Sequence, residues 1–120
     1  MSSDPYSARV RELFAATPHA GTLDDGVLVQ IEDQGVRVEL SATVDRDRVV
    51  ALKFRAWGCP HLIAAAEAFC TGFERQQAAH LKSFTAAGLM QTLAVPAEKT
   101  GRILVLEDAV RSLGAAVRNP

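Results

Sequence analysis

Residues 36–44 read VRVELSATV, and this stretch decides the fold class because its side chains alternate in character at every position. Apolar residues occupy the even-numbered positions, and charged or hydroxyl-bearing residues occupy the odd-numbered ones. A period of two residues is typical of a β-strand that buries one face and exposes the other to water. The sequence therefore predicts a half-buried strand at these residues.

Two further strands are predicted on either side of this one. Residues 27–31 also alternate, and Asp33-Gln34-Gly35 has the composition of a tight turn before residue 36. A second polar turn at residues 45–48 precedes a third strand. Short strands joined by tight turns pair as an antiparallel meander. The third strand is expected to point four residues inward, namely Val50, Leu52, Phe54 and Ala56.

Helices are predicted before and after the strands. Asp4 and Pro5 suit the N-cap and first turn of a helix that ends near Thr17. Pro60 suits the first turn of a second helix, and Thr85 could cap a short third one. A last helix is expected from about residue 102, with apolar residues near a 3.6-residue period.

The order of these elements predicts one α+β domain spanning residues 1–120. It consists of an N-terminal helix, a three-stranded antiparallel sheet, and later helices packed on one face of that sheet. The 120 residues are 48% hydrophobic, which is ordinary for one globular domain.

Composition and missing motifs exclude several functional classes. The formal net charge is −1 without any basic run, so nucleic-acid binding is not predicted. No apolar stretch approaches the roughly 20 residues of a membrane span, and residues 1–6 do not resemble a signal peptide. We therefore expect a cytoplasmic protein. Motifs of serine hydrolases, nucleotide-binding loops and HExxH metalloproteases are absent, so an enzyme is not predicted.

Cys59 is the first candidate functional residue because it lies where the third strand ends and a helix begins. A thiol at a helix N-terminus meets unpaired backbone N–H groups and the positive end of the helix dipole, and both favour the thiolate. A small residue that fits a tight corner is the alternative interpretation. Cys70, the other of the two cysteines, falls on the apolar stripe of that helix and is interpreted as a core residue.

His61 follows Cys59 by two residues, and a Cys-x-His pair could supply two ligands to a soft metal ion. Two ligands do not complete a site, so a surface histidine at a helix start is the simpler interpretation. His19 and His80 carry no clear functional signal in the sequence.

Three segments resemble the IscU/NifU N-terminal family of iron–sulfur cluster assembly scaffolds. Residues 54–59, FRAWGC, resemble the family's central strand–Gly-Cys–helix motif, and residues 106–110, LEDAV, resemble its last-helix signature. Residues 95–99, VPAEK, stand where the family has a chaperone-binding segment. The resemblance implies the IscU/SufE-like fold. It also implies partners such as a cysteine desulfurase or other assembly proteins, and partner contacts at Pro96 and Lys99.

The chain departs from this family at the ligand positions. Family members hold a nascent cluster or zinc with three cysteines, and an ungapped comparison keeps only the second, as Cys59. The first falls at about Asp33 and the third at Arg102. An iron–sulfur cluster or zinc is implied by the family, yet two of three cysteine ligands are missing, so the cofactor stays undetermined. If the last helix lies beside Cys59, the Arg102 cation would repel a metal ion and stabilise a thiolate.

Three hypotheses follow from the sequence. In the first, the protein is a divergent scaffold-like member in which Cys59 accepts or relays sulfur, with Arg102 favouring its anion. In the second, it is a non-catalytic interaction or regulatory module that binds assembly partners without holding a cluster. The third, a metal site built from Cys59, His61 and Asp33, ranks last.

Overall fold

The computed structural model describes residues 6–118, with the side chain of residue 118 excluded. The predicted helix cap at Asp4 and Pro5 lies outside these residues. The elements follow the predicted order, and their bounds are α1 Ala8–Ala15, β1 Val27–Asp33, β2 Val36–Asp45, β3 Arg48–Trp57, α2 Pro60–Phe73, η1 Ala78–Ser83, α3 Ala87–Thr92, η2 Ala97–Lys99 and α4 Thr100–Arg118.

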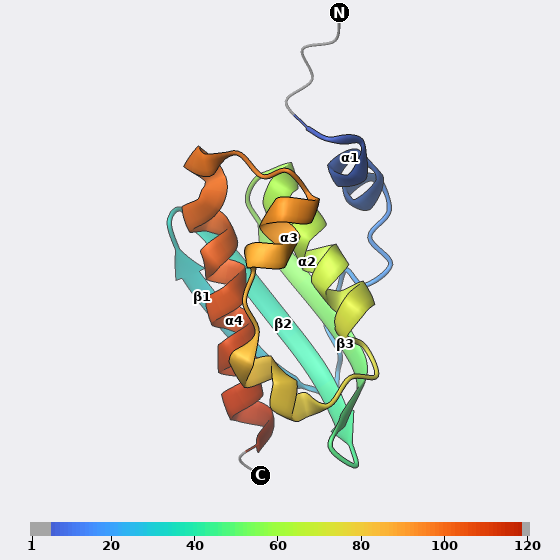
Figure 1. The fold of residues 1–120 in the computed structure, drawn as a ribbon. Helices are drawn as coiled ribbons and strands as arrows, with labels where there is room; N and C mark the ends of the chain where they lie inside the picture. Colours follow the sequence, from blue (N-terminus) through green and yellow to red (C-terminus); the bar gives the residue numbers. More distant parts are fainter. Residues whose placement is uncertain (1–5, 119–120) are drawn as a thin grey trace, which may run out of the picture.

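The three strands form one antiparallel sheet in the order β1-β2-β3, and α2 and α4 pack on one face of it (Figure 1). This is the predicted α+β architecture. Within the described part of the chain, no helix is both long enough and apolar enough to cross a membrane.

Both hairpin turns have two central residues with positive φ angles. These are Gln34 and Gly35 at 53° and 74°, and Arg46 and Asp47 at 52° and 68°. Positive φ at both positions is the geometry of a type I′ turn, whose twist matches that of the flanking strands. In the β1–β2 hairpin, this turn sets the register in which Val38 lies opposite Ile31. In the β2–β3 pair the register shifts between Thr43 and Val44, and beyond that shift Val38 lies opposite Ala56.

Asp47→Gly is expected to stabilise the protein by about 0.5–1 kcal/mol, because glycine adopts positive φ without the steric penalty of a side chain. Urea unfolding of the two proteins measures this difference. Loss of stability would mean that the Asp47 side chain makes a contribution larger than the backbone strain that it causes.

The prediction that Val50 points inward is wrong. The β2–β3 register shifts between Thr43 and Val44, so that Thr43 pairs with Ala51 while Val44 pairs with Val49. This β-bulge leaves Val50 as the extra residue, 48% exposed, and turns Val49 into the core instead. Leu52 and Phe54, beyond the bulge, are buried as predicted.

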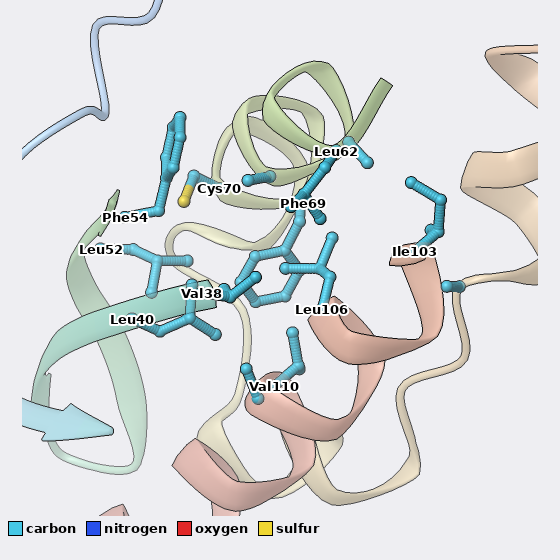
Figure 2. Close-up of a cluster of buried hydrophobic side chains, with 14 of the residues drawn as sticks. Val38, Leu40, Leu52, Phe54, Leu62, Phe69, Cys70, Ile103, Leu106 and Val110 are labelled. Atoms are coloured by element: carbon cyan, nitrogen blue, oxygen red, sulfur yellow. The ribbon is translucent and has the colours of Figure 1, made fainter. Parts of the chain in front are cut away.

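The core lies between the sheet and the two long helices. Figure 2 shows side chains from β2, β3, α2 and α4 meeting in one cluster, labelled Val38, Leu40, Leu52, Phe54, Leu62, Phe69, Cys70, Ile103, Leu106 and Val110. Cys70 is fully buried there, as predicted.

Two predicted helix starts differ from the structure. The N-cap of α1 is Ser7, whose hydroxyl accepts a hydrogen bond from the backbone N–H of Val10. Thr85 does not cap α3. Its N-cap residue is Ala86, whose N–H donates to the Glu107 carboxylate in α4 at 2.8 Å. A side chain distant in sequence therefore satisfies this helix start.

Candidate functional site

Three chain segments meet at one end of the molecule: the β1–β2 turn, the β3–α2 junction and the start of α4 (Figure 1). A Cβ atom on Gly58 would lie 2.9 Å from the Val36 side chain, and one on Gly101 would lie 3.3 Å from the Gln34 side chain. These close approaches place the turn against both helix starts.

Cys59 is the N-cap residue of α2, as its position in the sequence predicts. Its backbone is extended, and its carbonyl accepts hydrogen bonds from the N–H groups of Leu62 and Ile63 at 3.0 and 3.2 Å. Its side chain makes no capping hydrogen bond and is partly buried against the core. The thiol thus stands at a helix N-terminus with partial access to solvent.

A second helix begins at the same end of the molecule as the Cys59 helix. Helices α2 and α4 both begin at this end of the molecule (Figure 1). Arg102 lies in the first turn of α4 and is partly buried, and no ion pair to it occurs within the described residues. The structure therefore places Cys59 and Arg102 at the same end of the molecule.

His61 is buried, which contradicts the interpretation of a surface histidine. Its side chain is 1% exposed, and the Tyr6 ring packs on it with ring centroids 4.8 Å apart. Burial lowers the pKa of His61, and the nearby positive charge of Lys99 lowers it further, against an opposing effect of Glu98. Within residues 6–118, neither ring nitrogen has a hydrogen-bond partner.

The proposed metal ligands Cys59, His61 and Asp33 do not form a metal site in the structure. Among the described residues, no group of three or more His, Cys, Asp or Glu side chains is arranged to hold a metal ion. Asp33 is exposed, and its carboxylate accepts a hydrogen bond from the Gln34 N–H at 2.8 Å. A cluster needs several thiolates, so these residues do not fit an iron–sulfur cluster.

Pro96 precedes the short helix η2, and Lys99 is the last residue of η2, immediately before α4. Pro96 is its N-cap residue, and both side chains are partly buried. Lys99 is close enough to His61 for its charge to act on the imidazole. The predicted partner segment is thus part of the same end of the molecule as Cys59.

Trp57, two residues before Cys59, is a candidate that sequence reasoning missed. It is 37% exposed at the end of β3. The guanidinium groups of Arg37 and Arg55 stack on its ring at 3.8 and 4.8 Å from the centroid. Arg37 lies directly opposite Trp57 across the β2–β3 pair. Exposed tryptophan flanked by arginine is the composition of protein interaction sites.

His19 forms a second cluster that the sequence did not reveal. Its imidazole Nδ1 contacts Glu67 at 2.5 Å, its Nε2 contacts Glu74 at 3.1 Å, and its backbone N–H donates to Glu67 at 3.0 Å. The Thr71 hydroxyl also donates to Glu67. Burial alone would lower the pKa of His19, but the hydrogen bonds and negative charges of Glu74 and Glu67 outweigh it and raise that pKa. This cluster fastens the α1–β1 connection to α2.

In the comparison with protein families, the model of the NifU-like N-terminal domain matches residues 5–118. The chain belongs to this family. A search of curated protein sequences finds no match. The NifU-like assignment agrees with the resemblance of the three sequence segments and with the observed fold.

Several solved structures share the fold of this NifU-like chain. One is a hypothetical protein with a TM-score of 0.71 and 22% identity, over 93% of this chain and 96% of that one. Another, from Fervidobacterium islandicum AW-1, is described as a proposed iron–sulfur cluster assembly scaffold protein for the SUF system. It has a TM-score of 0.68 and 15% identity, over 92% and 95% of the two chains.

A third structure is the N-terminal part of a nitrogen-fixing NifU-like protein from Brucella abortus. Its TM-score is 0.61 at 15% identity, over 92% of this chain and 88% of that one. At these identities the likeness is one of fold.

Proposed function

We propose that this protein works in iron–sulfur cluster assembly as a scaffold-like sulfur acceptor, with Cys59 as the acting thiol. The family match and the two scaffold-related structural neighbours support the assembly role. The observation that carries the finer assignment is that one partly accessible cysteine stands at a helix N-terminus. Among residues 6–118, no group of three or more His, Cys, Asp or Glu side chains could hold a metal ion there.

The two cysteines differ in the way this proposal requires. Cys59 is partly exposed at the N-terminus of α2, and its side chain makes no capping hydrogen bond. Cys70 is fully buried, and burial together with the charges of Glu67 and Glu74 raises the pKa of its thiol. Only the thiolate is nucleophilic, so Cys70 is expected to be inert.

The reaction that fits a single thiolate is sulfur exchange with a persulfide donor. The Cys59 thiolate attacks the outer sulfur of a donor persulfide, R–S–SH, and forms a new Sγ–S bond. The donor S–S bond breaks, and the donor leaves as the thiolate R–S⁻. The transferred sulfur keeps its oxidation state, so the reaction needs no added oxidant or reductant. A cysteine desulfurase that carries a persulfide is the class of donor implied by the family resemblance.

Arg102 is assigned a supporting role in this proposal. Its fixed positive charge at the start of α4 would favour both the Cys59 thiolate and the persulfide anion that follows. A cation at this position opposes a bound metal ion for the same reason.

The second candidate is an interaction module that binds assembly partners through the segment containing Pro96 and Lys99. The exposed Trp57 with its two stacked arginines favours some protein contact at this end of the molecule. In this alternative, Cys59 has no chemical role, and replacing it would leave the function unchanged.

Cys59→Ser is expected to abolish sulfur uptake from glutathione persulfide, whereas Cys70→Ser, a similarly small change, should retain it. The measurement is selective labelling of persulfides followed by mass spectrometry of the peptides around residues 59 and 70. Circular dichroism verifies that both variants fold. Equal labelling of wild type and Cys59→Ser, or labelling at Cys70, would eliminate the sulfur-acceptor proposal.

A further inference from the structure

The outer edge of β3 is covered by the chain segment 17–21 for only part of its length. The Phe54 N–H donates to the carbonyl of His19 at 2.9 Å, and the Phe54 carbonyl accepts from the Gly21 N–H at 2.8 Å. Ala20 and Phe54 form a parallel bridge. Phe54 therefore directs both backbone groups away from β2 and toward this segment.

The backbone N–H and C=O groups of Ala56, like those of Phe54, must point away from β2. In an antiparallel pair, residues two apart share the direction of their N–H and C=O groups. The β2–β3 register runs without a shift from Leu40–Phe54 to Val38–Ala56. The covering segment, however, turns away from β3 at Gly21, where φ is 135°. The next hydrogen bond from this segment to the sheet is made by the Leu23 N–H, which donates to the Ser41 hydroxyl on β2. Within residues 6–118, no hydrogen bond outside the ladder reaches Ala56.

A pocket of about 280 Å³ opens beside this uncovered edge. Its walls come from segment 17–21, from the last residues of β3 and from Ile63 of α2. Ala56 and Trp57 both line it, so the residue with the uncovered backbone groups is part of the pocket wall. An extended peptide could hydrogen-bond to Ala56 and insert an apolar side chain into the pocket.

Two arginines adjoin the pocket, and Glu32 and Glu39 lie opposite them in the sheet. Arg55 lines the pocket, and its guanidinium lies with that of Arg37 over the Trp57 ring. Arg55 is half exposed and also forms an ion pair with the largely buried Glu39 at 3.8 Å. No ion pair to Arg37 occurs in the described part of the chain. A guanidinium stacked on an aromatic ring keeps its N–H donors in the ring plane available for a carboxylate.

We propose that the β3 edge at Ala56, with the adjacent pocket, docks an extended segment of a partner protein that presents an apolar side chain next to a carboxylate. The segment adds to the sheet through the backbone of Ala56, and its carboxylate pairs with Arg37 and Arg55. This inference rests on the proposed function, because Cys59 is two residues beyond Trp57 and a partner docked here would bring its persulfide to that thiol.

The test uses Trp57, which is the only tryptophan of the chain, and the Ala56 amide as two local reporters. The protein carries Cys59→Ser, and no sulfur donor is present. The probes are three blocked hexapeptides that alternate glutamate with valine, lysine with valine, and glutamate with glycine. Fluorescence titration gives affinities, and amide chemical shifts map the binding site.

The glutamate–valine peptide is expected to change the Trp57 fluorescence and to shift the Ala56 amide, with affinity at least about tenfold above that of either other peptide. Arg55→Gln should weaken its binding several-fold, while Lys82→Glu on exposed η1 should not. Equal binding of the lysine and glutamate peptides, shifts confined to the β1 edge, or no shift at Ala56 would overturn the proposal.

The outcome is independent of sulfur chemistry, because the tested protein lacks the Cys59 thiol. Failure of docking would leave sulfur uptake at Cys59 untouched. Failure of sulfur uptake in the labelling experiment would leave peptide docking at β3 as a separate result.

Discussion

His19→Ala is expected to lower the free energy of unfolding by about 3 kcal/mol at pH 6, because it leaves the carboxylate of Glu67 buried without its positive partner. Glu67 is 1% exposed and keeps only the backbone N–H of residue 19 and the Thr71 hydroxyl as donors. Loss of the imidazole also removes the bridge to Glu74. The α1–β1 connection should therefore loosen from α2.

The size of this effect should depend on pH in a defined direction. The pKa of His19 is raised above its ordinary value of 6.5, so the folded state binds the proton more tightly than the unfolded state does. Its stabilisation is complete below about pH 6.5 and is lost as the pH rises through the folded-state pKa. The difference between wild type and His19→Ala should therefore shrink between about pH 6 and pH 9.

Urea unfolding of both proteins across this pH range measures the difference, and His80→Ala on exposed η1 is the matched control. The opposite titration of His61, whose lowered pKa destabilises the fold in acid, is common to both proteins and cancels. A difference that stays constant with pH would mean that His19 acts only through packing.

Leu106→Ala is expected to cost about 3 kcal/mol of stability, because it opens a cavity at the centre of the core. Leu106 is fully buried on α4 and lies close to Phe69 and Val38 in Figure 2. Leu104, two residues earlier on the same helix, is 40% exposed, so Leu104→Ala should cost less than about 0.5 kcal/mol.

Denaturant unfolding of this pair separates burial from helix propensity, since both substitutions are Leu→Ala in one helix. Similar losses for the two variants would contradict the placement of Leu106 in the core. A loss above about 5 kcal/mol would exceed the range of single core truncations and would indicate a wider collapse of the α4–sheet contact.

The architecture could be predicted because its signals are local. The alternation of residues 36–44 and the turn at Gln34-Gly35 specify strands and register without reference to the rest of the chain. The corner at Cys59-Pro60 specifies the helix start in the same way. The predicted inward orientation of Val50 is wrong, because a β-bulge reverses which side chains face the core, and the apolar pattern of the strand does not indicate the bulge.

The clusters of charged and aromatic side chains could not be predicted, because they join residues distant in sequence. His19 meets Glu67 and Glu74 only after the α1–β1 connection folds along α2. One signal was available: Glu67 interrupts the apolar stripe of α2, and a carboxylate on a buried face requires a partner. The burial of His61 could not be predicted, because residues that cover it, such as Tyr6, belong to another part of the chain.

The most direct test of the central claim is native mass spectrometry of the wild-type protein after anaerobic incubation with glutathione persulfide and ferrous iron. If Cys59 accepts sulfur without holding a cluster, the mass of the wild-type protein should increase by one sulfur atom, and no iron should be retained. The mass of Cys59→Ser should not change. A retained iron–sulfide mass that depends on Cys59 would contradict this account and show that the chain holds a cluster despite its missing cysteines.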